Sequence, residues 1–211
     1  MKWEELLAIS GVEPVFSSSL LLAGKVSASQ VRLQLTRWVK AGRLIQLRRG
    51  LYALAPVWRK VEPNAFVVAN KLQSGSYISL QSALSFHGVI PEYVPVVTSV
   101  GPGRPEMLRT LLGSFQFNHI APGMLYGYSR LEVAPRQFAF VASAEKALLD
   151  LVYLTPQADS PDYLRELRLQ NIDSINIQTL HNLAGRSGRP KLLRTAKIVK
   201  KLLKVEEGET I

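Results

Sequence analysis

Apolar positions recur at helical spacing at the start of the chain. Trp3, Leu6, Leu7 and Ile9 predict a short amphipathic helix that ends near Gly11, and Pro14 interrupts the chain after it. The serines at 17–19 are candidate N-caps for a second short helix, which Gly24 ends. Two short helices are therefore expected before residue 25.

The third helix has the clearest signals for its ends. Ser27 and Gln30 have the spacing of a capping box, and Gly42 follows Ala41 as the expected C-terminal stop. Two apolar runs, RLIQL and LYAL, then flank Arg48-Arg49-Gly50 and predict two strands around a turn. Helix, short helix, long helix and hairpin follow each other in the order of a winged helix-turn-helix.

Projection of the third helix at about 100° per residue separates two faces. The core face holds Val31, Leu35, Trp38 and Val39. The opposite face and its flank carry the candidate base-reading residues Ser29, Gln30, Arg32, Leu33, Thr36, Arg37 and Lys40. Arginine and glutamine can pair with base edges in the major groove, and leucine can contact a thymine methyl group. Arg43, Arg48 and Arg49 on the wing are expected to meet phosphates or the minor groove.

Charge strengthens this interpretation. The chain has 26 Lys and Arg against 16 Asp and Glu, a net charge of +10. Residues 1–60 account for +7 of it, and no acidic residue lies between Glu13 and Glu62. A purely solvent-exposed face usually mixes both signs, so the imbalance favours double-stranded DNA as the partner over a structural winged helix. A membrane would need an apolar inserting stripe, which the N-terminal third lacks.

The remaining residues predict a second, larger domain of α+β class. Ala55-Pro56 closes the hairpin, and Glu62-Pro63-Asn64 marks the boundary between a winged helix domain at 1–61 and a mixed domain at 62–211. Helices are expected at 65–72, from Ser79 or Ser82 to Phe86, and after Ser143. Strands are expected at 76–80, 96–100, 113–120, 124–133 and 137–142.

No constellation of an enzyme is visible in this domain. His87, His119 and His181 are far apart without ligand spacing, so each is interpreted as structural and no metal or cofactor is expected. Gly113-Ser114 lacks the Asp-x-Asp that a nucleotidyltransferase needs, and Gly101-Pro102-Gly103 lacks the residues of a phosphate-binding loop. Glu145 and Asp150 are interpreted as a first-turn acid and a solvated helix edge. The chain has no cysteine, which fits a reducing cytoplasm, and no signal or transmembrane segment is expected.

Residues 186–204 form a second basic segment, with eight basic side chains and no acidic one. Pro190 fits the first turn of a helix, and Leu192, Ala196, Val199 and Leu203 form its apolar stripe. The interpretations are a docked helix with a solvated outer face, a second DNA-phosphate contact, or a dock for an acidic toxin surface. The candidate contacts are Lys191, Arg194, Lys197, Lys201 and Lys204.

Several segments together resemble the AbiEi antitoxins of type IV toxin–antitoxin systems. They are VRLQLTRWVKAGRLIQLRRGLYALAP, SYISLQSALSFHGVIPEYVP, GSFQFNHI and AEKALLDLVYL, between about residues 15 and 155. The resemblance implies an N-terminal domain that binds repeats in its own promoter and represses the operon. It also implies a C-terminal domain that neutralises a cognate nucleotidyltransferase toxin.

The sequence therefore predicts a non-enzymatic, DNA-binding autorepressor that is also an antitoxin. The first alternative is a stand-alone transcription factor whose second domain senses a small ligand. The second is a nucleic-acid-processing enzyme that uses the winged helix for targeting, against which the missing catalytic constellation argues. A neighbouring gene with nucleotidyltransferase motifs would favour the antitoxin.

Overall fold

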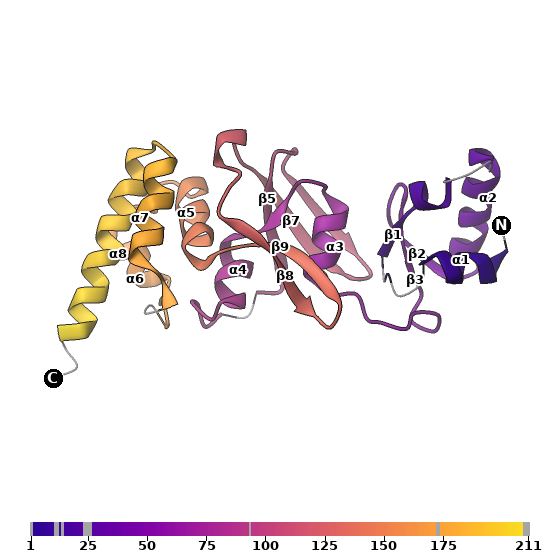
Figure 1. The fold of residues 1–211 in the computed structure, drawn as a ribbon, viewed down its shortest axis with the longest axis horizontal. Helices are drawn as coiled ribbons and strands as arrows, with labels where there is room; N and C mark the ends of the chain where they lie inside the picture. Colours follow the sequence, from indigo (N-terminus) through magenta and orange to yellow (C-terminus); the bar gives the residue numbers. More distant parts are fainter. Residues whose placement is uncertain are drawn as a thin grey trace.

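A computed structural model describes residues 2–10, 13, 15–22, 27–92, 94–171 and 174–208, with the side chains of residue 9 and of 203–208 excepted. The molecule is elongated. A small N-terminal domain lies at one end, a sheet flanked by helices in the middle, and a layer of helices at the other end (Figure 1). The expected α+β class, with a larger α+β region after a small N-terminal domain, is confirmed.

The N-terminal domain consists of helices packed on a three-stranded antiparallel sheet in the order β1-β3-β2. Its elements are α1 (Trp3–Ser10), β1 (Val15–Ser17), the 3-10 helix η1 (Ser18–Leu22), α2 (Ala28–Lys40), β2 (Leu44–Arg48) and β3 (Leu51–Leu54). The third helix and the hairpin lie where the sequence predicts them. Strand β1 was missed, because three residues carry too little periodicity and pairing with β3 defines it. The expected stops at Gly11, Pro14 and Gly24 lie outside the described residues.

The larger region is built on a six-stranded mixed sheet in the order β6-β7-β5-β4-β9-β8. Its strands are β4 (Tyr77–Ile78), β5 (Val96–Gly101), β6 (Glu106–Thr110), β7 (Gly113–His119), β8 (Tyr128–Ala134) and β9 (Gln137–Ala142). The β4–β9 and β5–β7 pairs are parallel and the others antiparallel. Strand β6 was missed because it is an edge strand whose residues are all half-buried or exposed, with no apolar alternation to mark it.

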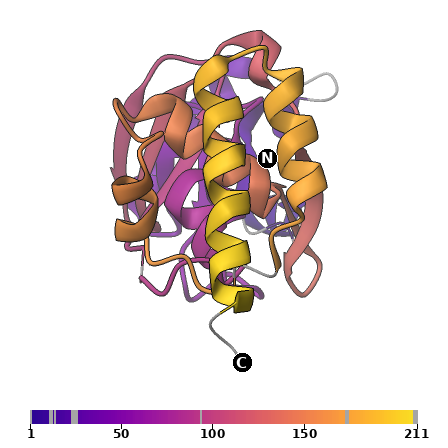
Figure 2. The ribbon, with the colours of Figure 1, turned by 90° about the vertical axis from the view of Figure 1, so that its left-hand side faces the viewer.

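Helices cover this sheet and extend beyond it. They are α3 (Ala65–Leu72), α4 (Leu80–Phe86), the 3-10 helix η2 (Pro122–Met124), α5 (Ala144–Leu154), α6 (Pro161–Glu166), α7 (Ile177–Arg186) and α8 (Pro190–Gly208). Helix α3 has the predicted bounds, α4 follows Ser79, and α8 begins at the predicted Pro190. Figure 2 shows α8 lying across the outer end of the molecule with α7 beside it. None of the helices in the described part of the chain combines the length and apolarity that crossing a bilayer requires.

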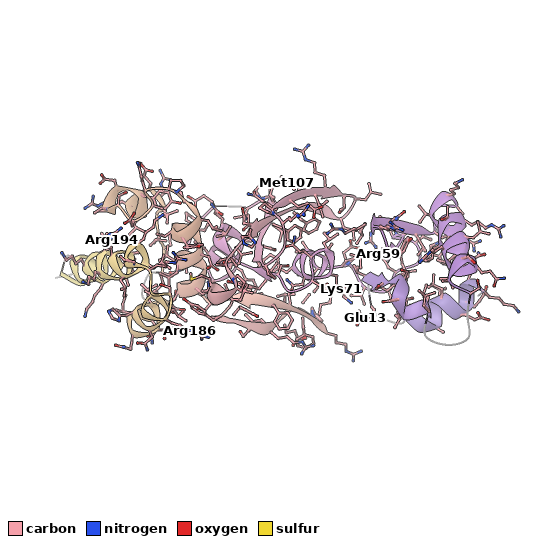
Figure 3. All side chains as sticks on the ribbon, turned by 90° about the horizontal axis from the view of Figure 1, so that it is seen from above. Glu13, Arg59, Lys71, Met107, Arg186 and Arg194 are labelled. Carbon is pink, nitrogen blue, oxygen red and sulfur yellow. The ribbon has the colours of Figure 1, made fainter. Side chains whose placement is uncertain are left out.

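The two regions share a packed interface. Val15, Leu47, Leu51 and Ala53 of the small sheet belong to the same buried cluster as Val68 and Leu72 of α3. Ion pairs flank this contact. Lys71 Nζ lies 2.7 Å from Glu13 Oε2, and both residues are found at the junction in Figure 3. The position of the hairpin is thus set by the second region as well as by its own strands.

Candidate nucleic-acid interface

Helix α2 is anchored by one apolar face. Val31, Leu35 and Trp38 are buried, as the helical projection predicts. They belong to a cluster with residues of α1, η1 and the small sheet, and the Trp38 ring meets the ring of Trp3 edge-on with centroids 5.1 Å apart. Interlocked rings leave a helix little freedom to rotate, so the direction of its outer face is fixed before any partner arrives.

The N-terminal end of α2 differs from the prediction, whereas its C-terminal end agrees with it. Ser27 is the N-cap residue, but its hydroxyl contacts the hydroxyl of Ser29 at 2.8 Å and makes no capping bond, so the capping box was wrong. Gly42 has φ +67°, and the amides of Gly42 and Arg43 donate to the carbonyls of Val39 and Trp38. This is the Schellman arrangement, which favours glycine because the left-handed backbone strains other residues.

The outer side of α2 carries mainly polar and basic side chains and is here called the reading face. All its members are exposed: Ser29, Gln30, Arg32, Leu33, Thr36, Arg37 and Lys40. The Leu33 side chain is 53% exposed, and the Thr36 hydroxyl donates back to the Arg32 carbonyl. Within the described part of the chain, no side-chain hydrogen bond or ion pair occupies Gln30, Arg37 or Lys40, so their polar groups are available to a ligand. The surface has the chemistry of a major-groove reader.

The three predicted wing arginines have different surroundings. The guanidinium of Arg43 lies 5.3 Å from the centre of the Trp3 ring and 5.8 Å from that of Trp58. Cation–π contacts with two rings hold Arg43, which is half-buried, against the N-terminal core. Arg49 is exposed at the hairpin turn, next to Gly50 with its φ of +80°.

Arg48 faces the second region. Its Nη1 donates to the carbonyl of Leu72 at 2.9 Å, and its Nη2 lies 3.1 Å from the carboxylate of Glu106. Leu72 ends α3 and Glu106 begins β6, so a single guanidinium ties the hairpin to two elements of the larger region. Of the three predicted wing contacts, only Arg49 presents its charge at the turn without such a partner among the described residues.

Some basic side chains of the C-terminal helix α8 bind other residues of the same chain. Leu192, Ala196 and Val199 are buried as the stripe predicts, whereas the side chains of Leu203 and Lys204 lie outside the described part. Lys191 Nζ donates to the Thr155 carbonyl at 2.6 Å. Arg194 donates from Nε and Nη2 to Asp159 Oδ2, at 2.9 and 2.7 Å, and these bonds hold the pKa of Asp159 below its ordinary value.

The exposed cations of α8 lie elsewhere on the helix. Lys197, Lys200 and Lys201 are exposed, and the first two line a hollow of about 380 Å³ together with Gln178 and His181 of α7. Helix α8 lies at the opposite end of the long axis from α2 (Figure 1). The two basic surfaces are therefore separate.

Glu145 lies in the first turn of α5 as predicted, but Asp150 is not a solvated edge, so that part of the interpretation was wrong. Glu145 and Asp150 are both buried, and Glu145 Oε1 accepts from the Asn176 amide at 2.8 Å. Asp150 accepts hydrogen bonds from the hydroxyls of Tyr77 and Ser79, at 2.9 and 2.8 Å, and pairs with Lys146 one turn away.

This Lys146–Asp150 pair is fully enclosed, with both side chains 0% exposed. Burial raises the pKa of Asp150, against the opposing effect of the Lys146 charge, and burial lowers the pKa of Lys146. Burial together with the Asp150 charge also raises the pKa of the Tyr77 hydroxyl. The hydrogen bonds from Tyr77 and Ser79 to Asp150 connect α5 to β4 and to the residue that follows it. The sequence did not reveal this pair because Asp150 lies within the apolar run ALLDLVYL. A Lys and an Asp four residues apart at the start of that run were the signal that could have predicted it.

Two histidines make the structural contacts that were expected. His87 Nε2 lies 2.7 Å from the Ala142 carbonyl, and His119 Nδ1 lies 3.1 Å from the Gly103 carbonyl. His181 is exposed in the hollow beside α8. Within the described ranges, no three His, Asp or Glu side chains come together as metal ligands would.

Comparison with known proteins places the N-terminal part of the chain beside a known family. A search among curated proteins found no significant similarity. Over residues 4–55, the chain matches the family model AbiEi_4, described as "Transcriptional regulator, AbiEi antitoxin", which confirms the resemblance of its N-terminal domain to the AbiEi antitoxins.

Proposed function

We propose that this protein represses its own operon by binding repeats in the promoter through the reading face of α2. One observation carries the proposal: a rigidly anchored helix presents Gln30, Arg37 and Lys40 outward in a domain with a large basic excess. Bidentate side chains supply base specificity, and exposed cations such as Arg49 supply phosphate contacts. The family match of residues 4–55 supports the same assignment.

The test is a binding selection with randomised duplexes, followed by titration of the selected site. We expect Arg37→Ala to weaken specific binding by about 1–3 kcal/mol and to relax the preference at one base position. Arg109→Ala is the matched control, because Arg109 is an exposed arginine on the β6 edge of the other region. Unchanged affinity and base preference in Arg37→Ala would refute the reading face.

We further propose that the region from about Glu62 onward neutralises a cognate nucleotidyltransferase toxin. The resemblance supplies this role, and the exposed lysines of α8 supply a candidate contact surface. A toxin that handles nucleotides with magnesium presents carboxylates, which a cationic helix attracts. Because α8 lies far along the molecule from α2, its lysines are better placed for a separate partner than for the same operator half-site (Figure 1).

The test of this second role reverses charges within the full chain. Lys197→Glu with Lys200→Glu should abolish growth rescue during toxin expression and leave promoter repression intact. Arg194 is avoided because its reversal would break the contact with Asp159. The matched control reverses Arg104 and Arg109, which are exposed just before β6 and near its end. Intact rescue with lowered operator affinity would instead assign α8 to the DNA interface.

One observation favours the alternative of a ligand-sensing regulator. A hollow of about 340 Å³ opens between α4, β5 and β7, and apolar side chains line it beside Gln81, Gln116, Glu92 and Glu166. Such a mixed lining is typical of small-molecule sites. If the protein represses its promoter, gives no protection from any neighbouring toxin and releases DNA on addition of a metabolite extract, the alternative replaces the antitoxin role.

A further inference from the structure

An aromatic groove lies between α3 and the β8–β9 hairpin, far from the reading face in sequence. Its volume is about 540 Å³. Three aromatic side chains on one face of the hairpin are unusually exposed, Tyr128 by 38%, Phe138 by 39% and Phe140 by 45%. The other wall is formed by Asn70, Lys71 and residues 74–76. Exposed aromatic clusters of this kind mark binding surfaces, because an unpartnered patch costs solubility.

Strand register places these rings together. In the antiparallel pairing of β8 with β9, Tyr128 is opposite Ala142, Arg130 opposite Phe140 and Glu132 opposite Phe138. Side chains two residues apart on a strand share a face, so Tyr128 and Arg130 lie on the same side as Phe138 and Phe140. The ring of Phe140 meets that of Tyr128 edge-on, with centroids 6.0 Å apart.

Two planar stacks are already formed on this face. Tyr128 lies parallel to the buried Tyr77, with centroids 4.3 Å apart and planes 14° apart, so its exposed area belongs to its other face and its edge. The guanidinium of Arg130 lies 3.8 Å from the centre of the Phe138 ring. Each stack therefore ends toward solvent in a flat group, a phenol ring in one case and an exposed guanidinium in the other.

The charged side chains around the groove indicate which kind of ligand it suits. Lys71 lines the groove, and the exposed Arg130 and Arg136 lie on β8 and on the turn of the same hairpin. The carboxylate of Glu132 on β8 accepts the Arg136 amide at 2.8 Å. Lys71 also pairs with Glu13 across the junction. Flat stacking groups with surrounding cations match a chain of bases joined by phosphates, since every base offers a π face and every phosphate a negative charge.

We propose that this aromatic groove binds single-stranded nucleic acid. One base stacks on Tyr128 and a neighbouring base on the Arg130 guanidinium, while Lys71 and Arg136 meet the phosphates. The site is independent of the duplex-reading face, so the protein has two nucleic-acid surfaces of different selectivity. Stacking is tolerant of base identity, and the groove is accordingly expected to select single strands over duplexes and to discriminate weakly among sequences.

The experiment measures fluorescence anisotropy of labelled oligo(dT) and oligo(U) strands of twelve nucleotides with the full-length protein, in parallel with a labelled operator duplex. Tyr128→Ala and Arg130→Ala should each weaken single-strand binding about tenfold and leave duplex binding unchanged. Tyr128→Trp, which keeps a stacking face, should retain single-strand binding. The two labelled strands report whether RNA or DNA is preferred, and either preference supports the site.

Arg37→Ala is the reciprocal variant, and Leu111→Ala, which removes an exposed apolar side chain at the turn after β6, is the matched control. If Arg37→Ala removes single-strand and duplex binding together while the groove variants change neither, the strands bind at the reading face and the proposal is overturned. It is equally overturned if the groove variants keep single-strand binding and instead lose a co-purifying toxin, since the groove is then a protein interface. Retained folding of Tyr128→Ala is checked by circular dichroism, and Arg130→Ala carries the test if that variant unfolds.

Discussion

The buried Lys146–Asp150 pair provides a sharp test of whether the acidic motif on α5 is structural or catalytic. Removal of one partner from an enclosed ion pair typically costs about 3–5 kcal/mol, whereas replacement of both by apolar residues is often close to neutral. Lys146→Met leaves the Asp150 carboxylate with the hydroxyls of Tyr77 and Ser79, both within 2.9 Å. We therefore expect a loss of about 3 kcal/mol, at the lower end of that range.

Asp150→Leu should be costlier because it leaves three donors without their acceptor: the Lys146 ammonium and the two hydroxyls. The ammonium keeps only its contacts with the rings of Tyr126 and Tyr77, 4.9 and 5.7 Å from their centres. We expect a loss of about 5 kcal/mol for this variant. The double variant should be more stable than Asp150→Leu alone, since it removes the buried charge together with the missing acceptor.

The pH dependence of stability gives a second, independent prediction for the pair. In Lys146→Met, burial holds the folded-state pKa of Asp150 above its unfolded value, without the opposing charge of Lys146. A raised carboxyl pKa makes the folded state relatively more stable at low pH and less stable as the pH rises through the gap between the two values. The stability deficit of Lys146→Met relative to wild type should accordingly shrink as the pH falls from above the folded-state pKa of Asp150 toward its unfolded value.

The assay is urea unfolding followed by far-UV circular dichroism, which reports mainly on the larger region. All three tryptophans, Trp3, Trp38 and Trp58, lie near the N-terminus, so their fluorescence follows the winged helix separately. Equal costs for the two single variants, with strict additivity in the double variant, would show that the residues do not act as a pair. A stable double variant that has lost toxin protection would give the pair a functional role beyond structure.

Three further predictions concern the winged helix and the C-terminal helix. Arg49→Ala should reduce the slope of log K against log salt for operator binding by about one unit. Arg48→Ala should leave that slope unchanged, because the Arg48 guanidinium pairs with Glu106 and donates to the Leu72 carbonyl. Equal slopes in both variants would contradict the assignment. Gly42→Ala should lower stability by about 1 kcal/mol through its φ of +67°, although the position has open space for a methyl group, and a neutral thermal melt would refute the strain argument. The hydrogen bonds from Arg194 lower the folded-state pKa of Asp159, so their stabilisation is present above the unfolded pKa and is lost as the pH falls through the folded value. Asp159→Asn should therefore be less stable than wild type at pH 7, and the difference in unfolding free energy should close toward pH 3 in a denaturation series. A difference that widens as the pH falls would contradict this prediction.

The sequence by itself determined the features that depend on local spacing. The two faces of α2, the glycine at its C-terminal end and the start of α8 at Pro190 were all readable because each follows from residues within a few positions of one another. Helix α3 and strands β7 and β9 were readable for the same reason. The basic excess of the first sixty residues likewise needs no fold, and by itself it favours a polyanion as the partner.

Only the tertiary structure decided which charges are free. Arg48 and Glu106 are 58 positions apart, Lys191 and Thr155 are 36 apart, and Asp150 and Tyr77 are 73 apart, so no periodicity links them. A lone arginine on a wing and a lone aspartate on a helix have the same local pattern whether they face water, DNA or a distant strand. Their roles follow from the packing of the hairpin on α3 and of α5 on β4, because long-range packing brings together the partners that neutralise a charge or leave it available.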